Sequence, residues 1–267
     1  CGKTTRVLAL ISEACKKYAP ERIGAISYTN SAVQTIRERI SRTAGVSEDA
    51  AENVKTLHAH CFKLLELKKD NIADTKIAEW NQAYPQWELP LNSKPQDEDD
   101  STEFPTVIRH NVADNRTFFN RMQVLRNRLV PIEQWPAYAR DFYEDWKWWM
   151  DTSGYIDFTG MLEEVAEMEM CPPIDILFVD EAQDASRLQF KILAQWAERA
   201  TSTLYVGDSD QAIFRWNGAS PEGFMNLKAT WNKVLDQSYR VPKAVHEYAL
   251  RIISQAKDRE IVQYHPT

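Results

Sequence analysis

Short apolar runs that alternate with helical patterns constrain the fold of this chain more than any other feature. The run from Ile174 to Val179 ends in four consecutive apolar residues and is followed at once by the carboxylates Asp180 and Glu181. Such a run is typical of a strand buried on both faces, as in a parallel sheet covered by helices. Similar runs occur at 23–28, 54–57, 203–206 and 233–235. The alternation predicts an α/β fold with a doubly wound parallel sheet.

Helical spacing of apolar residues fills the intervals between these runs. The pattern predicts a helix over 7–17, a second helix capped by Asn30 or Ser31, and a third after residue 57. Each of these helices has an apolar face that can cover the sheet.

The composition is that of a globular protein. Of the 267 residues, 43% are hydrophobic and 27% charged, and no stretch approaches the roughly 18 apolar residues of a membrane span. The net charge of −7 argues weakly against a nucleic-acid partner, although a local groove can bind nucleic acid whatever the charge of the whole chain. Scattered cysteines without a CxxC pair disfavour a zinc or iron–sulfur site and favour free thiols in a reducing cytoplasm. They are Cys1, Cys15, Cys61 and Cys171.

The middle of the chain has a different character, with an acidic run, an arginine-rich segment and then closely spaced tryptophans. We predict a mainly helical insertion over 67–153, with a solvated loop over 92–105. The arginines could contact duplex DNA, but a solvated helix face is the favoured interpretation. They are Arg109, Arg116, Arg121, Arg126 and Arg128. We expect the cluster of Trp146, Trp148 and Trp149 to form the core of the insertion.

The chain opens on a sequence that suits phosphate binding, Gly2-Lys3-Thr4-Thr5 before a helix. Gly2 would let the backbone approach a phosphate, and the helix that follows offers free N–H groups. Lys3 would reach the β- and γ-phosphates, and the Thr4 hydroxyl would ligate Mg²⁺. By itself this is half of a P-loop, and a chance match before a helix is the alternative.

The second candidate site is Asp180-Glu181, at the carboxyl end of the 174–179 strand, where open α/β sheets bind ligands. Asp180 is suited to hold Mg²⁺, and Glu181 is suited to polarise the water that attacks a γ-phosphate. An ordinary acidic turn after a strand is the alternative.

Two further segments follow later strands. After 203–206, Gln211 could contact a γ-phosphate, while Phe214 and Trp216 offer flat faces to nucleic-acid bases. Farther on, Arg240 could stabilise charge on a transferring phosphoryl group, and Tyr239 could stack on adenine. Taken singly, Trp216 is as easily explained as a core residue.

The order and spacing of these segments resemble those of the UvrD/Rep-type superfamily 1 helicases. The resemblance rests on seven segments: 2–5, 28–32, 56–58, 157–162, 179–184, 207–216 and 238–240. It implies a RecA-like P-loop NTPase motor that hydrolyses ATP with Mg²⁺ and binds single-stranded DNA and single/double-strand junctions. It departs from the family at Asn217, where arginine is usual, and at Leu57, where phenylalanine is common.

The resemblance also implies a role for each matching residue. The nucleotide and its metal would be bound by Gly2, Lys3, Thr4, Thr5, Asp180, Glu181, Gln211, Tyr239 and Arg240. Of these, Thr4 and Asp180 would hold Mg²⁺, Glu181 would activate water, and Lys3, Gln211 and Arg240 would act on the phosphates. Single-stranded DNA would be contacted by Tyr28, Thr29, Asn30, His58, Phe214, Trp216 and Asn217.

The resemblance predicts three parts. Residues 1–66 and 154–235 would form the RecA-like motor domain, 67–153 the inserted domain, with a possible role in binding protein partners, and 236–267 the start of a second RecA-like domain. Family motifs V and VI would lie beyond Thr267, and the first P-loop glycine before Cys1. We therefore expect the 267-residue chain to fold but not to unwind DNA alone.

Two other functions remain open at this point. One is a non-catalytic nucleic-acid- or partner-binding remnant of such a motor, against which the intact Lys3, Asp180 and Glu181 argue. The other is a P-loop phosphotransferase, which has no use for an aromatic shelf such as Phe214 to Trp216.

Overall fold

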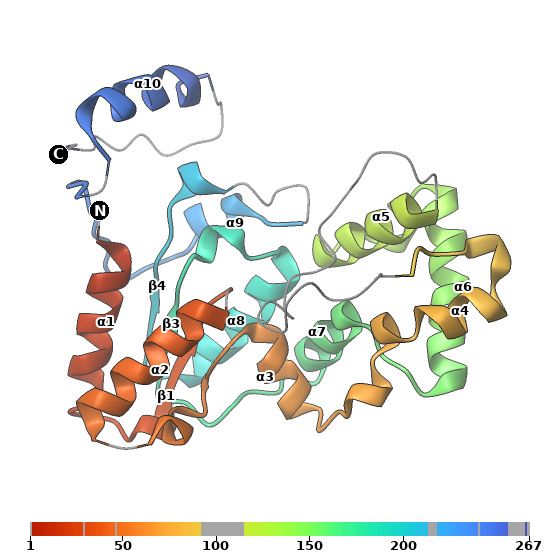
Figure 1. The fold of residues 1–267 in the computed structure, drawn as a ribbon, viewed down its shortest axis with the longest axis horizontal. Helices are drawn as coiled ribbons and strands as arrows, with labels where there is room; N and C mark the ends of the chain where they lie inside the picture. The colour runs from red at the N-terminus through yellow and green to blue at the C-terminus, as the bar shows by residue number, and fades with distance from the viewer. Residues whose placement is uncertain are drawn as a thin grey trace.

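A parallel sheet lies at the centre of the structure, which is a computed structural model describing residues 2–28, 30–45, 47–91, 115–212, 218–239, 241–255 and 265. Within these residues the sheet has four strands in the order β2-β1-β3-β4, and every neighbouring pair is parallel. The strands are β1 (Ile23–Ile26), β2 (Val54–Lys55), β3 (Ile176–Val179) and β4 (Ser202–Tyr205) (Figure 1). The predicted α/β fold with a parallel sheet is confirmed.

Helices cover both faces of the sheet, because successive side chains of a strand point to opposite faces. Leu177 and Val179 of β3 contribute to one core, and Phe178 between them contributes to the other. On the Phe178 side lie α1 (Lys3–Ala14) and α2 (Asn30–Ala44). On the other side lie α3 (Leu57–Leu64), α7 (Phe158–Glu167) and α8 (Arg187–Arg199). The doubly wound arrangement is therefore confirmed.

Two of the predicted strands differ from the observed backbone. The run at 54–57 is a strand only as far as Lys55, because Thr56 caps α3 by accepting a hydrogen bond from the Ala59 N–H at 3.3 Å. The run at 233–235 is not a strand: Val234 is 46% exposed and lies in irregular backbone. Apolar character predicts a strand only where the segment is buried, and this one lies on the surface.

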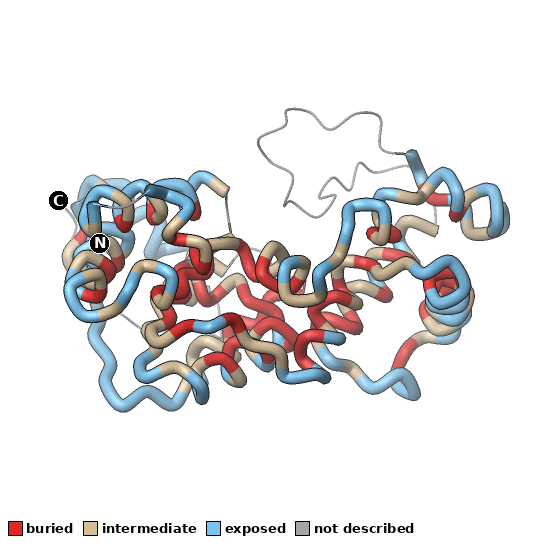
Figure 2. The backbone as a smooth tube through the Cα atoms, turned by 90° about the horizontal axis from the view of Figure 1, so that it is seen from below, coloured by how far each residue is buried: buried red, intermediate tan, exposed pale blue. Residues whose placement is uncertain are grey.

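The insertion has its own aromatic core, built by α4 (Ile77–Ala83), α5 (Asn115–Asn127) and α6 (Ala137–Ser153). The buried ring of Trp80 packs edge-on against Trp146 and Trp149, with ring centroids 5.0 and 5.4 Å apart. Buried residues are accordingly concentrated in two regions, around the sheet and in the insertion (Figure 2). The core prediction is confirmed for Trp146 and Trp149. It is wrong for Trp148, which is 65% exposed because it lies on the opposite face of α6.

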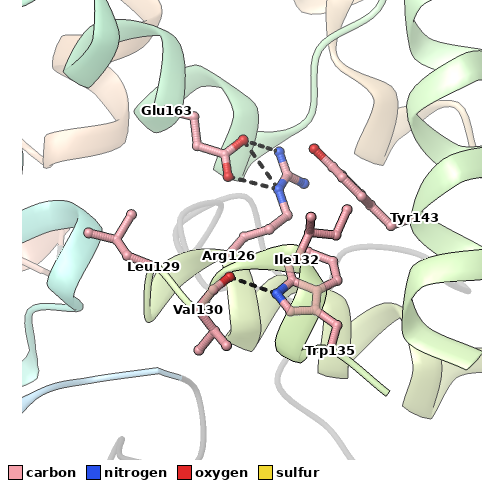
Figure 3. Close-up of a pocket in the computed structure, with 7 residues that line it drawn as sticks. All are labelled: Arg126, Leu129, Val130, Ile132, Trp135, Tyr143 and Glu163. Atoms are coloured by element: carbon pink, nitrogen blue, oxygen red, sulfur yellow. Dashed lines mark hydrogen bonds and ion pairs between the residues drawn. The ribbon is translucent and has the colours of Figure 1, made fainter. Parts of the chain in front are cut away.

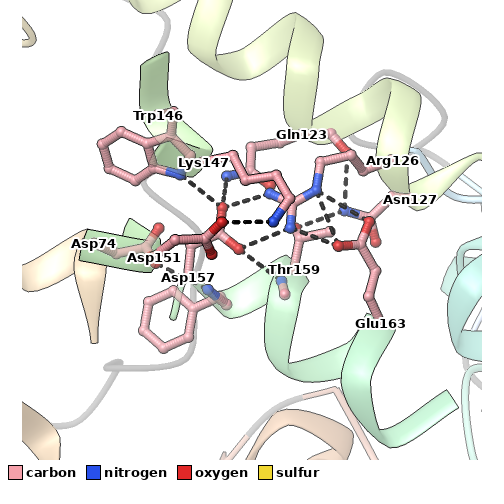
Figure 4. Close-up of polar contacts among 12 residues, drawn as sticks. Asp74, Gln123, Arg126, Asn127, Trp146, Lys147, Asp151, Asp157, Thr159 and Glu163 are labelled. Carbon is pink, nitrogen blue, oxygen red and sulfur yellow. Dashed lines mark hydrogen bonds and ion pairs between the residues drawn. The ribbon is translucent and has the colours of Figure 1, made fainter. Parts of the chain in front are cut away.

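A buried carboxylate, that of Asp157, joins the insertion to the sheet domain (Figure 4). Asp157 is the N-cap of α7, and its Oδ1 accepts the Gly160 N–H at 2.6 Å. Its Oδ2 accepts the indole N–H of Trp146 at 3.0 Å. Arg126 of α5 donates to both oxygens of Asp157 and also to Glu163. The Arg126 side chain is only 3% exposed. The predicted solvated arginine face is therefore wrong for Arg126, whose charge is balanced by two carboxylates of α7.

The remaining elements are short or peripheral. They comprise α9 (Pro221–Met225), α10 (Lys243–Ile253) and 3₁₀ turns at Pro20–Arg22, Glu48–Ala51, Lys69–Asn71, Ala73–Thr75, Pro85–Trp87, Ile132–Gln134, Ala182–Asp184 and Ser209–Gln211. Within the described ranges, none of the helices combines the length and the apolar character needed to cross a membrane. The predicted loop at 92–105 and Arg109 lie outside the described residues. The three domain boundaries proposed above stay predictions.

The Asp157 junction leads to a stability prediction. Burial by itself would raise the pKa of Asp157, but the charge and hydrogen bonds of Arg126 hold it below its ordinary value, so the pair is ionised. Arg126→Met leaves two carboxylates without their cation and should lower the free energy of unfolding by roughly 3–5 kcal/mol. Lys147→Met, which breaks an exposed pair with Asp151 on α6, should cost less than about 0.5 kcal/mol. Chemical denaturation of both variants measures the difference, and equal losses would contradict this view of the junction.

Candidate nucleotide site and nucleic-acid interface

The carboxyl ends of the parallel strands meet at one edge of the sheet. β1 and β3 pair in register, from Ile23 opposite Ile176 to Ile26 opposite Val179, so the two chains leave the sheet side by side. The segments that follow the strands there are 27–28 after β1, 56–58 after β2, 180–181 after β3 and 206–208 after β4. Ligands of open parallel sheets bind at this edge, so four of the predicted segments share one location.

Helix α1 begins with a glycine in the left-handed conformation. Gly2 has φ 71° and ψ 25°, and no side chain caps this end of the helix. The Arg6 N–H donates to the Gly2 carbonyl at 3.0 Å, so the N–H groups of residues 3–5 precede the first intrahelical hydrogen bond. Together with the positive end of the helix dipole, these groups suit an anionic phosphate. Thr4 and Thr5 are exposed on this turn.

Lys3 connects this turn to the carboxylates after β3. Its Nζ lies 3.2 Å from Oε2 of Glu181, although 178 positions separate the two residues in the sequence. The Lys3 side chain is 13% exposed and that of Glu181 37%, so the carboxylate can still reach solvent. Glu181 also has a positive φ of 49°, a conformation that is uncommon outside glycine and that concentrates at functional sites. The structure thus brings two of the four predicted catalytic residues, Lys3 and Glu181, into contact.

Asp180 is the buried member of the adjacent carboxylates. Its Oδ1 accepts the Glu181 N–H at 3.0 Å. Burial and then the neighbouring Glu181 raise the pKa of Asp180, so a bound cation would stabilise its charged form. Among the described residues, no group of three or more His, Cys, Asp or Glu side chains forms a metal cage. One buried carboxylate fits Mg²⁺, which commonly binds one or two carboxylates plus substrate phosphates and water. The exposed Thr4 hydroxyl lies on the same helix turn as Lys3, whose ammonium contacts the neighbouring Glu181.

The loop after β4 contains Gln211, which is exposed at the end of a 3₁₀ turn. Its side-chain amide donates to the Asp208 carboxylate, so it points back to its own loop. Two polar residues near this loop received no role from the sequence: Gln183, which is buried, and Asp184, which is partly buried. Burial, followed by the charge of Glu181, raises the pKa of Asp184 to about 6. The signal for both was present in the sequence, since polar residues directly after a buried strand end face the same edge.

Three predicted DNA-contacting residues lie at the carboxyl ends of β1 and β2. Tyr28 is partly exposed, but its hydroxyl is buried and has no hydrogen-bond partner among the described residues. Asn30 is the first residue of α2. Burial lowers the pKa of His58 to about 4, and its ring packs edge-on against Phe158 with centroids 6.1 Å apart. His58 is therefore neutral near pH 7, so any contact with a DNA phosphate would be a hydrogen bond without an ionic component.

Tyr239 lies next to the α1 turn. The side chain is 73% exposed, and its Cδ2 is 4.0 Å from the position that a Cβ on Gly2 would take. The predicted stacking of Tyr239 on a nucleotide base stays a prediction. The other predicted site residues, Thr29, Phe214, Trp216, Asn217 and Arg240, lie outside the described residues.

A separate pocket of about 420 Å³ lies where the insertion meets the sheet domain (Figure 3). Arg126 and Tyr143 form part of its wall, with the guanidinium carbon 5.3 Å from the ring centroid, and Trp135 and Leu129 add apolar surface. The charge of Arg126 is already balanced by Asp157 and Glu163. We therefore assign this pocket to the packing of the junction and not to ligand binding.

A substitution of Tyr28 tests whether its buried hydroxyl lacks a hydrogen-bond partner. An unsatisfied buried hydroxyl is destabilising, so Tyr28→Phe should raise the free energy of unfolding by about 1 kcal/mol. Tyr205→Phe is the matched control, because the Tyr205 hydroxyl donates to the Leu193 carbonyl at 3.3 Å, and its loss should cost about 0.5–1.5 kcal/mol. Denaturation curves of the two variants should shift in opposite directions, and a destabilised Tyr28→Phe would show that the hydroxyl has a partner.

Comparison with known proteins identifies the family of the chain. A family model described as "UvrD/REP helicase N-terminal domain" matches residues 1–232. The ATP-dependent DNA helicase PcrA of Bacillus subtilis (strain 168) is 24% identical over 278 residues, covering 96% of this chain and 36% of the relative. PcrA of Staphylococcus aureus (strain Mu50) is 23% identical over 286 residues, with the same two coverages.

The chain thus spans about a third of the length of these relatives. The family match, however, covers most of the chain and includes the segments from Gly2 to Gln211 described above. On this basis the chain belongs to the UvrD/Rep helicase family.

Proposed function

We propose that this protein provides the nucleotide-hydrolysing part of an ATP-dependent DNA helicase that moves along single-stranded DNA. The observation that carries the proposal is the 3.2 Å contact of Lys3 with Glu181, beside buried Asp180 and the open first turn of α1. In this proposal the arrangement would supply a phosphate-binding turn, a cation, a metal ligand and a base at one edge of the sheet. PcrA relatives are named ATP-dependent DNA helicases, which supports the same activity.

The proposed chemistry assigns one task to each group. The free N–H groups of residues 3–5 and the Lys3 ammonium bind the phosphates of ATP. Mg²⁺, held by Thr4 and Asp180, would neutralise negative charge on the β- and γ-phosphates. Glu181 orients the attacking water and accepts its proton. Gln211 then contacts the γ-phosphate, and Arg240 supplies positive charge from the segment that follows Tyr239.

The proposed DNA side lies next to these groups. Tyr28 at the end of β1 and the aromatic pair Phe214 and Trp216, shortly after Gln211, would stack on bases of a single strand. Asn30 and His58, with Thr29 and Asn217, would contact its backbone. Because Trp216 follows Gln211 by only five positions in the sequence, loss of the γ-phosphate would change the affinity for DNA. Single/double-strand junctions are the substrate that such a motor would meet.

The role of Glu181 is tested by Glu181→Gln in the intact protein. The amide keeps the size of the side chain but cannot accept the proton, so ATP should still bind while hydrolysis falls roughly 100-fold or more. Steady-state hydrolysis and equilibrium nucleotide binding measure the two effects. Glu198→Gln, an exposed change on α8, is the control and should leave both values unchanged. A Glu181→Gln enzyme within a few-fold of wild type would rule out the assigned base.

The role of Trp216 is tested by Trp216→Ala. Base–aromatic stacking contributes about 1–3 kcal/mol, so single-strand affinity should fall by about 5- to 150-fold, while hydrolysis without DNA stays largely intact. Trp231→Ala removes a tryptophan that is 61% exposed, and it should leave DNA affinity unchanged. Fluorescence anisotropy with a labelled single strand provides the measurement. An early cooperative melt of Trp216→Ala would instead identify Trp216 as a core residue.

A further inference from the structure

A continuous series of hydrogen bonds runs from Glu181 through Gln183 and Asp208 to Gln211. We propose that Gln183 is a positioning residue that holds the catalytic carboxylate and the Gln211 loop in one fixed arrangement. The inference rests on the proposed function of Glu181 and Gln211. It assigns Gln183 a task that the sequence pattern does not imply.

One end of the Gln183 side chain holds the carboxylates. Gln183 lies in the 3₁₀ turn directly after β3 and is 1% exposed. Its Nε2 donates to Glu181 Oε2 at 2.9 Å and to Asp184 Oδ2 at 3.3 Å. The same Glu181 oxygen contacts the Lys3 ammonium at 3.2 Å. A buried amide and a cation therefore fix one oxygen of Glu181 from two directions.

The other end of the Gln183 side chain holds the loop after β4. Its Oε1 accepts the backbone N–H of Asp208 at 2.9 Å. The approach requires glycine at the preceding position, because a Cβ on Gly207 would lie 2.7 Å from this Oε1 and 2.9 Å from Cζ of Phe224. Contacts below 3.0 Å do not occur for real Cβ atoms. Gly207 thus allows the loop to dock directly on the Gln183 amide.

Asp208 completes the connection. Its carboxylate accepts the side-chain amide of Gln211 and, at 3.1 Å, the N–H of Asp210, and its carbonyl accepts the Gln211 N–H at 2.9 Å. The path from Glu181 to Gln211 is therefore made by two side chains, those of Gln183 and Asp208. Hydrogen bonds linked in this way hold their members in a defined geometry, most strongly at the buried Gln183, whereas Gln211 at the other end is exposed.

The chemistry of the position requires an amide. Gln183 donates at one end and accepts at the other, and both ends are used inside the protein. Glutamate has the acceptor for the Asp208 N–H but no donor for Glu181, and it adds a negative charge beside two others. Methionine has a similar length and neither group. Gln183→Glu thus removes the hydrogen bond to Glu181, whereas Gln183→Met also removes the hydrogen bond from the Asp208 N–H.

The test measures ATP hydrolysis by the intact protein with and without single-stranded DNA. Gln183→Met should lower kcat by about 10- to 100-fold through misplaced groups, with the KM for ATP within about threefold of wild type. It should also reduce the stimulation of hydrolysis by DNA. Gln183→Glu should lower kcat similarly but keep the stimulation ratio, because the acceptor for Asp208 remains. Gln189→Glu, a buried amide that helps to cap α8, is the matched control and should keep wild-type kinetics.

A second measurement does not depend on activity. Hydrogen–deuterium exchange of residues 206–212 should become faster in Gln183→Met, where the Asp208 N–H loses its acceptor, and stay slow in Gln183→Glu and Gln189→Glu. Unchanged exchange in Gln183→Met overturns the inference, as does an unchanged kcat in an active protein. A parallel change of KM and kcat, with exchange faster throughout the chain, would show a general structural role and also overturn it. A wild-type protein without ATP hydrolysis would refute the proposed function alone, and the exchange result would still decide the inference.

Discussion

The parallel sheet is the constraint on which the rest of the structure depends. Strands that all run in one direction must deliver their carboxyl ends to one edge, and here the register of β1 with β3 and of β3 with β4 does so residue by residue. Segments from widely separated parts of the chain then become neighbours, as in the contact of Lys3 with Glu181. The helices on both faces keep the central strands β1 and β3 buried, so the backbone hydrogen bonds between them are protected from water.

A second constraint holds the insertion against this sheet. Asp157 caps α7, accepts the Trp146 indole of α6 and pairs with Arg126 of α5, so one carboxylate connects three helices. A buried ion pair adds little net stability compared with apolar packing, but its geometry is specific, because a displaced partner leaves a charge without compensation. The junction therefore fixes how the aromatic core of the insertion sits beside α7.

Among its described residues, the candidate site contains more carboxylates than cations, and this imbalance favours a ligand that brings positive charge. Asp180, Glu181 and Asp184 lie within five positions, and the pKa of Asp180 and that of Asp184 are raised by burial and by Glu181. Lys3 is the cation in contact with the group. A magnesium–nucleotide complex would add positive charge beside the carboxylates and phosphate beside Lys3 and the first turn of α1. Binding and charge compensation would thus occur together.

The sequence by itself determined the fold class and the candidate residues, because wholly apolar strands and the carboxylates after them are local patterns. The runs at 23–28 and 174–179 contain the buried strands β1 and β3, and the run at 203–206 overlaps β4, which is only partly buried. Pairings between distant segments were decided only by the tertiary structure. The partners of Arg126 are 31 and 37 positions away, and the Asp208 N–H that Gln183 accepts is 25 positions away. Val234 and Trp148 are exposed although apolar. Periodicity describes one segment, whereas burial and hydrogen bonding depend on what folds against it.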